Sequence, residues 1–345
     1  MCVKDTGTKY QLWISDFNID GTFTRVHPFI ISHTKTMTRT REDGKEEVFS
    51  ACIKPDDTRY LGGSKNPSID AIKLQGRPRT GINYDKANEF CANRGDWITM
   101  IDYLEYCAIQ ALCYIEYANF DNQAALNTNL TSEGFKQGGL GAGVTNLAWD
   151  RWTAFNGNNP IVQTYWTAEH NIGNGSTNGD HYELGHYNTD GSNFATYPAV
   201  YRGILNFFGD IWTFIRDVVI INRNANYNSV YLLKKGVNHS DITIDNIQDK
   251  CYFIGDQANT NSFITEFDFR FGPYFVPNKV GTNKKADYNE IRGNNGQDTD
   301  KAVRVLLLGG CATDGSLAGS GYFTSAQVRG FSSFIVGFFT TVKLD

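Results

Sequence analysis

The stretch "YRGILNFFGDIW", from Tyr201 to Trp212, carries four aromatic rings and two glycines within twelve residues. Aromatic clusters are usually buried, and glycine permits turns that a side chain would forbid. We therefore predict that the aromatic rings of this stretch, called the anchor segment below, are buried in the core. We also expect its charged residues, Arg202 and Asp210, to pair with each other. The predicted anchors are Tyr201, Arg202, Gly203, Phe207, Phe208, Gly209 and Trp212.

Two helices are predicted upstream of the anchor segment. In "YDKANEFCANRG" the residues Ala87, Phe90 and Cys91 share one face, Asn83 is a suitable N-cap, and Gly95 is a suitable stop. The run "IDYLEYCAIQALCYIEYAN" has aliphatic residues at three- and four-residue steps, with Glu105 and Glu116 on other faces. The predicted buried face of this second helix is Ile101, Leu104, Ala108, Leu112 and Ile115.

Strands are predicted at both ends of the chain. The first 80 or so residues alternate apolar runs with turn signals such as Asp43-Gly44, and later runs are "DVVIIN", "SVYLLK", "KCYFIG", "VRVLLLGG" and "SSFIVGFFTTVKL". Residues 119–200 are rich in turn formers, yet the aromatic residues there favour ordered loop packed on the core. The order of elements predicts an α+β fold in which the two chain ends pair in one sheet.

Composition excludes several function classes. The chain has 345 residues, a net charge of −5 and no apolar run long enough for a membrane helix. It offers no basic field for nucleic acid, so we expect neither a nucleic-acid partner nor membrane insertion. Seven scattered cysteines without close pairs are interpreted as buried thiols.

Four stretches together resemble the C-type-lectin-fold proteins of tailed phages and prophages, a group that includes receptor-binding proteins diversified by retroelements. They are "KANEFCANRGDWITMIDYLEYCAIQALCYIEYANFDNQ", "YRGILNFFGDIW", "VYLLKKG" and "VRVLLLGGCATDGSLAGSGYFTSAQVRGFSSFIVGFFTTVKL". The resemblance implies a C-type lectin fold over residues 27–345, with two helices beneath a small, twisted, mainly antiparallel sheet and a loop insertion at about 119–200. Residues 1–26 are then an attachment segment or, equally, a first strand.

The last of these stretches is similar to the family pattern "GGSW…G…N…N.GFR", whose side chains form the ligand-binding face. Gly309 and Gly310 match it, whereas Cys311 and Ala312 stand where Ser-Trp is usual, and the asparagine-rich run is missing. These departures argue against active diversification. The resemblance places on this face Thr313, Asp314, Tyr322, Thr324, Gln327, Arg329 and Phe331. The alternative, ordinary strand and turn surface, is left open.

The resemblance implies a virion protein of a tailed phage, made in the host cytoplasm. We expect a tail-fibre or tail-tip receptor-binding protein that recognises a host glycan or protein, contacts other virion proteins and forms a homotrimer. The alternative is a structural decoration of capsid or tail that binds only virion proteins.

An enzyme of the formylglycine-generating oxidase type is a further alternative. It shares the fold and the order of Arg304-Val305 followed by Gly309-Gly310. Such enzymes need a pair of late cysteines for copper, and none follows Cys311. We therefore expect no enzymatic activity.

A histidine-rich stretch is the one metal candidate. His181, Glu183 and His186 lie close together in "EHNIGNGSTNGDHYELGHYNTDG", but their spacing matches no established zinc motif. Solvated loop histidines are the favoured interpretation, and no metal or other cofactor is expected.

Overall fold

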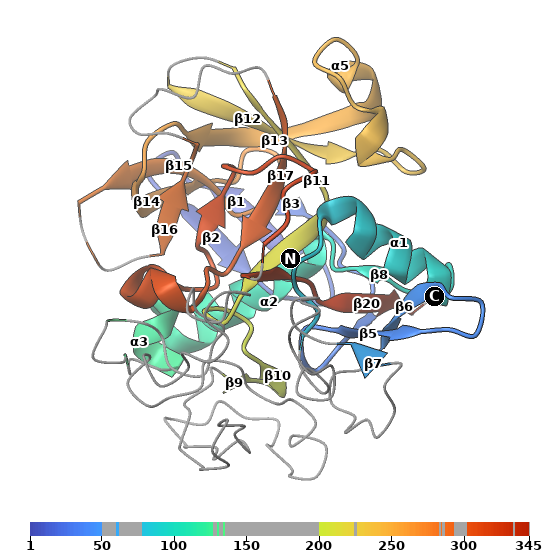
Figure 1. Cartoon of the computed structure of the whole chain (residues 1–345). Coiled ribbons are helices and arrows are strands. Elements are labelled where there is room, and N and C mark those ends of the chain that lie inside the picture. The colour runs from blue at the N-terminus through green and yellow to red at the C-terminus, as the bar shows by residue number, and fades with distance from the viewer. Residues whose placement is uncertain are drawn as a thin grey trace.

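In a computed structural model of the chain, the structure describes residues 1–49, 60–61, 78–126, 130, 134, 200–223, 226–282, 284, 287–292, 302–333 and 335–344. This part is α+β, with mostly sheet and few helices, as predicted (Figure 1). The helices are α1 Tyr84–Arg94, α2 Tyr103–Tyr117, α3 Asn122–Leu126 and α5 Ile247–Lys250, with the 3-10 turns η4 His239–Asp241 and η5 Ala312–Leu317.

The strands in the first part of the chain are β1 Cys2–Asp5, β2 Tyr10–Trp13, β3 Thr22–Phe23, β4 Phe29–Ile31, β5 Met37–Thr40, β6 Glu46–Phe49, β7 Tyr60–Leu61, β8 Thr99–Met100, β9 Val200–Tyr201 and β10 Ile204–Leu205. Those in the second part are β11 Trp212–Asn222, β12 Tyr227–Leu233, β13 Cys251–Ala258, β14 Ser262–Asp268, β15 Val276–Gly281, β16 Tyr288–Glu290, β17 Val303–Leu308, β18 Phe323–Thr324, β19 Val336–Gly337 and β20 Thr340–Lys343.

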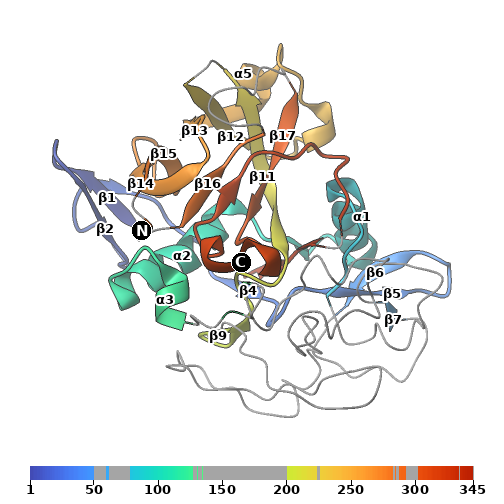
Figure 2. The ribbon, with the colours of Figure 1, turned by 60° about the vertical axis from the view of Figure 1, so that its left-hand side comes forward.

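The largest sheet has nine strands in the order β13-β12-β11-β17-β18-β16-β14-β15, with β19 paired to β11. Its two outer strands, β13 and β15, lie close to each other. The Asn278 side chain on β15 donates a hydrogen bond to the Asp256 carbonyl on β13 at 3.1 Å. The sheet is therefore nearly closed. Smaller sheets lie beside it, and α1 packs against the β5–β6 hairpin (Figure 2).

The two predicted helices are present. Asn83 caps α1 by accepting from the Lys86 N–H at 2.9 Å, Gly95 is the C-cap, and Ala87, Phe90 and Cys91 are buried, all as predicted. Asp102 and Glu105 form a capping box at the start of α2.

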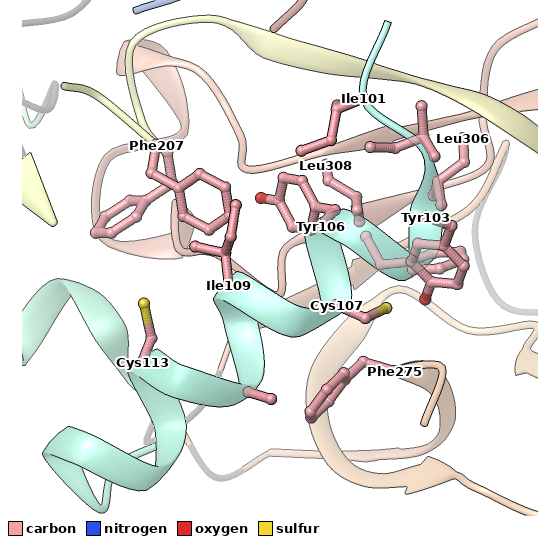
Figure 3. Close-up of a cluster of buried hydrophobic side chains, with 14 of the residues drawn as sticks. Ile101, Tyr103, Tyr106, Cys107, Ile109, Cys113, Phe207, Phe275, Leu306 and Leu308 are labelled. Carbon is pink, nitrogen blue, oxygen red and sulfur yellow. The ribbon is translucent and has the colours of Figure 1, made fainter. Parts of the chain in front are cut away.

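Of the predicted buried face of α2, Ile101, just before the helix, is fully buried, but the other four positions are wrong. Leu104, Ala108 and Leu112 are only partly buried, and Ile115 is 49 % exposed. The interior instead receives Tyr103, Tyr106, Cys107, Ile109, Gln110, Cys113 and Tyr114, together with Glu105. Figure 3 shows several of these side chains against Phe207, Phe275, Leu306 and Leu308. The core is aromatic. Tyrosines of α2 are therefore buried in it, in place of the aliphatic residues that the helical period predicted.

The chain ends pair as predicted. β20 lies between β4 and β8, with Val342 opposite Ile30 and Thr340 opposite Met100. The predicted strand runs fall within β11, β12, β13, β17, β19 and β20, and Asp43-Gly44 joins β5 to β6.

Residues 1–26 form a small three-stranded sheet, β2-β1-β3. Its first residue joins the main core: Met1 is 4 % exposed, and its amino group donates to the Thr24 carbonyl at 2.8 Å. The predicted loop insertion at 119–200 lies outside the described residues beyond Leu126, apart from residues 130, 134 and 200.

The anchor segment is almost entirely buried. Tyr201, Phe207, Phe208 and Trp212 are each 5 % exposed or less. β9 and β10 are joined by Arg202 and Gly203, whose φ angles of 47° and 78° are both positive, as a type I′ hairpin turn requires.

Backbone hydrogen bonds tie the anchor segment to three remote parts of the chain. Leu205 N–H donates to the His33 carbonyl, Gly209 N–H to the Gly309 carbonyl and Trp212 N–H to the Ile335 carbonyl, at 2.8, 3.1 and 2.7 Å. The segment is thus a junction between the chain ends and the turn that follows β17.

The predicted Arg202–Asp210 pair is not formed. Arg202 is half-exposed and pairs with Glu116, with Nε and Oε2 3.1 Å apart. Asp210 pairs with the fully buried Lys35, with Nζ and Oδ1 2.6 Å apart. Each charge finds a partner from a distant segment, which local spacing does not reveal.

Candidate functional site

The terminal segment, residues 309–331, begins with a turn that only glycine fits. Gly309 and Gly310 have φ angles of 96° and 73°. A Cβ on Gly310 would lie 2.9 Å from the Tyr322 ring, closer than real contacts allow, and a tight 3.1 Å from Ala318. This turn brings η5 back beneath β17.

Thr313 and Asp314 lie in η5, and their side chains point back to Cys311, which precedes it. The Asp314 carboxylate accepts the Cys311 N–H at 2.6 Å, and the Thr313 hydroxyl lies 3.0 Å from the Cys311 sulfur. Burial raises the pKa of the Cys311 thiol well above its usual range and also raises the pKa of Asp314. Cys311 is therefore a protonated thiol at neutral pH, with the weak nucleophilicity of a thiol.

Two of the predicted face residues are buried, which corrects their placement on an exposed surface. Tyr322 is 3 % exposed and packs edge-on against Trp212 and Tyr288, with ring centroids 4.5 and 5.5 Å apart. Thr324 is 2 % exposed, and its hydroxyl accepts the Ala326 N–H at 3.2 Å. Tyr322 precedes β18 and Thr324 ends it, and both strand residues of β18 are buried.

The remaining predicted residues are half-buried. The Arg329 Nε lies 3.3 Å from the Asp85 carboxylate on α1, with 36 % of the arginine side chain exposed. Phe331 packs against the cluster that contains Phe90 and Tyr322. The Gln327 carbonyl accepts a hydrogen bond from the Val305 N–H at 3.0 Å, so the backbone at Gln327 lies alongside β17.

Gln327 also lines an open groove of about 600 Å³. Its other residues come from the end of β16 and the two residues after it, from Asn261 before β14, and from the exposed Val328 and its neighbour Ala326. The groove residues are Asn261, Glu290, Ile291, Arg292, Ala326, Gln327 and Val328. Burial raises the pKa of Glu290, which the Thr324 side chain partly offsets by a hydrogen bond.

A network of buried amides bonds to the backbone of Glu290, one of the groove residues. Gln257 donates to the Asn289 side chain at 2.8 Å and to the Glu290 carbonyl at 3.2 Å. Asn289 in turn donates to the carbonyls of Ala258 and Thr260 at 2.9 and 2.8 Å. Because bonded polar networks are rigid, the backbone at Glu290 is held in place on this side of the groove.

Sequence reasoning did not find Asn261, Glu290 or Arg292. They come from segments distant from the terminal segment along the chain, and no motif marks them. The groove is polar, with amide, carboxyl and guanidinium groups, so it can hydrogen-bond a ligand.

The histidine-rich candidate falls outside the described residues, since His181, Glu183 and His186 are not among them. Within the described part, no three His, Cys, Asp or Glu side chains are grouped so that they could hold a metal ion. The six cysteines there are free and buried, as predicted. No helix in the same part is both long and apolar enough to cross a membrane.

No protein-family model matches the chain, and no curated protein matches its sequence significantly.

Proposed function

We propose that the chain is a virion protein of a tailed phage that recognises a host surface structure through a C-type-lectin-fold domain. The observation that carries this proposal is the groove of about 600 Å³ beside the predicted ligand-binding face. Gln327 lines it, and Arg329 follows two residues later with its side chain partly exposed.

The physical basis is a rigid scaffold that presents a polar surface. The amide network that bonds to the Glu290 backbone limits the conformational entropy that this side of the groove loses when a ligand binds. Arginine is one of the residue types that dominate binding energy at interfaces, and Arg329 is partly exposed. A tail-fibre or tail-tip position and a homotrimer belong to the same proposal, because several weak sites on one particle bind with higher avidity.

The test is saturable binding of the fluorescently labelled protein to a panel of intact bacterial cells. A Gln327→Ala/Arg329→Ala double variant is expected to lose at least tenfold in affinity on the cells that wild type binds. The matched control is Lys86→Ala/Glu89→Ala, which removes an exposed ion pair on α1 and is expected to bind normally. Equal binding by both double variants would contradict recognition through the terminal segment.

A second candidate function is a structural decoration that binds only other virion proteins. Three large apolar side chains between β2 and β3 favour it, because Ile14, Phe17 and Ile19 are 44 %, 69 % and 52 % exposed. Exposed apolar residues that lie close in sequence are typical of protein contacts. Absence of saturable cell binding by every oligomeric form, together with co-purification with virion components, would favour this candidate.

A further inference from the structure

A second cavity, of about 500 Å³, lies away from the groove and shares no lining residue with it. One side is the turn between β1 and β2, and the other is formed by β14, β15 and the end of α2. We call it the hairpin pocket. Its volume is within the range of small-molecule sites, roughly 300–1,000 Å³.

Aromatic rings form a continuous wall of the hairpin pocket. Phe267 lies between Phe269 and Phe120, with ring centroids 6.1 and 6.0 Å away. Tyr10 extends this wall from the hairpin, 5.5 Å from Phe269, and Tyr114 extends it from α2, 5.0 Å from Phe120. Phe120 is 54 % exposed, so part of the wall is open to solvent.

A buried carboxyl lines the same pocket. Asp287 is 3 % exposed, and its Oδ2 accepts the Tyr114 hydroxyl at 2.8 Å and the Gly321 N–H at 2.5 Å. Gly319 leaves space for it, because a Cβ there would lie 1.8 Å from Oδ1. Burial raises the pKa of Asp287 to about 7, so near neutral pH the group exchanges between hydrogen-bond donor and acceptor.

The rim of the hairpin pocket carries charges of both signs. Lys279 and Glu266 pair with Nζ and Oε2 2.7 Å apart, and both are well exposed. Lys9 and Asp5 line the hairpin side, where the Gly7 N–H donates to the Asp5 carboxylate at 2.7 Å and keeps the turn in shape. The rim therefore presents both donors and acceptors.

We propose that the hairpin pocket binds a neutral saccharide unit. The C–H groups of a sugar ring pack on the negative face of an aromatic ring, and the exposed Phe120 offers such a face. The sugar hydroxyls both donate and accept, which matches carboxylates and ammonium groups on one rim. An organic cation would meet the two lysines, and an anion would meet the three carboxyl groups, so a neutral ligand is favoured.

This inference does not depend on the groove as a receptor site. It gives the N-terminal hairpin a binding role in addition to its structural one. The pocket and the groove are tested with different variants and different probes. A result that contradicts one proposal therefore does not contradict the other.

The experiment is saturation-transfer NMR on the full chain with the methyl glycosides of glucose, galactose, mannose and N-acetylglucosamine. Wild type is expected to transfer saturation to at least one glycoside, and Phe120→Ala is expected to weaken that binding at least tenfold. The control is Trp97→Ala, because Trp97 is 57 % exposed after α1 and lines neither cavity. Glu266→Gln repeats the test if Phe120→Ala does not fold, as judged by thermal melting.

Three results would overturn the inference. The first is no saturation transfer from wild type to any of the four glycosides. The second is unchanged sugar binding in the pocket variants. The third is binding of tetramethylammonium by wild type without binding of any glycoside, which would assign the pocket to organic cations.

Discussion

The anchor segment and the terminal segment both combine aromatic rings with glycines, but the protein uses them differently. Phe207 and Phe208 of the anchor segment are fully buried, whereas the terminal segment passes from the buried Phe323 to the half-buried Phe331 and the exposed Gly330. The anchor segment forms backbone hydrogen bonds to residues 33, 309 and 335. Aromatic content alone therefore does not separate a structural segment from a surface one; the burial of the rings does.

The largest expected effect is the loss of a ring from the anchor segment. Phe207 is fully buried and stacks on Tyr106 with ring centroids 4.5 Å apart, so Phe207→Ala is expected to lower the free energy of unfolding by about 3–5 kcal/mol. Phe331→Ala, at a half-buried position, is expected to cost about 1–2 kcal/mol. Urea denaturation measures the free energy of unfolding of the two variants. Equal losses of stability would contradict the structural difference between the two segments.

The next effect is a pH dependence that involves the terminal segment. Burial raises the pKa of Asp287 from 3.8 to about 7, so between these values the folded protein binds more protons than the unfolded chain. The free energy of unfolding is therefore expected to fall as pH rises from about 4 to about 7, by at most about 1.4 kcal/mol per pH unit from this group.

Denaturation at several pH values, with wild type and Asp287→Asn, isolates this contribution. The variant is expected to lose that part of the slope, while other buried carboxyls such as Asp217 contribute to both proteins. Parallel pH profiles would show that Asp287 does not titrate in this range.

A smaller effect is expected from two glycines of the terminal segment. Gly310→Ala places a Cβ 2.9 Å from the Tyr322 ring at a positive φ of 73°, which is expected to cost about 1–3 kcal/mol. Gly330→Ala has no atom within 4 Å and is expected to change stability by less than about 0.5 kcal/mol. Thermal melts of both variants measure how the cost of a side chain differs between the structural start and the exposed end of the terminal segment.

The smallest effect is expected from the exposed ion pairs. Arg329→Ala and Arg202→Ala each remove a partly exposed pair, to Asp85 and Glu116, and each is expected to cost less than about 1 kcal/mol. Double-mutant cycles with the acidic partners measure both coupling energies. A large coupling at either site would mean that charge, and not burial, distinguishes the two segments.

Local signals predicted the elements of this fold well. The cap at Asn83, the stop at Gly95 and the turn at Asp43-Gly44 each depend on a few adjacent residues, and all are found. The pairing of the chain ends followed from two apolar runs at opposite ends of the sequence.

Signals that depend on tertiary partners were missed. The helical period of α2 selects Ile115, but the core selects Tyr106 and Tyr114, because their rings fill the space beside other rings and their hydroxyls find buried partners. The groove and the hairpin pocket combine residues from three or more segments, so no local pattern contains them. Fold-level analogy marked Gln327 and Arg329 but also placed the buried Tyr322 on the same face.

The pairing of β4 with β20 also sets an order of events during synthesis. The Thr340 N–H donates to the Ser32 hydroxyl, 308 residues earlier in the chain. At roughly 5–20 residues per second, β4 waits on the order of 15–60 s for its partner after it leaves the ribosome. Until then β4 is an unpaired strand that other nascent chains can join. Closure of this sheet is thus a late step, and the yield of folded protein depends on how well β4 is protected during that interval.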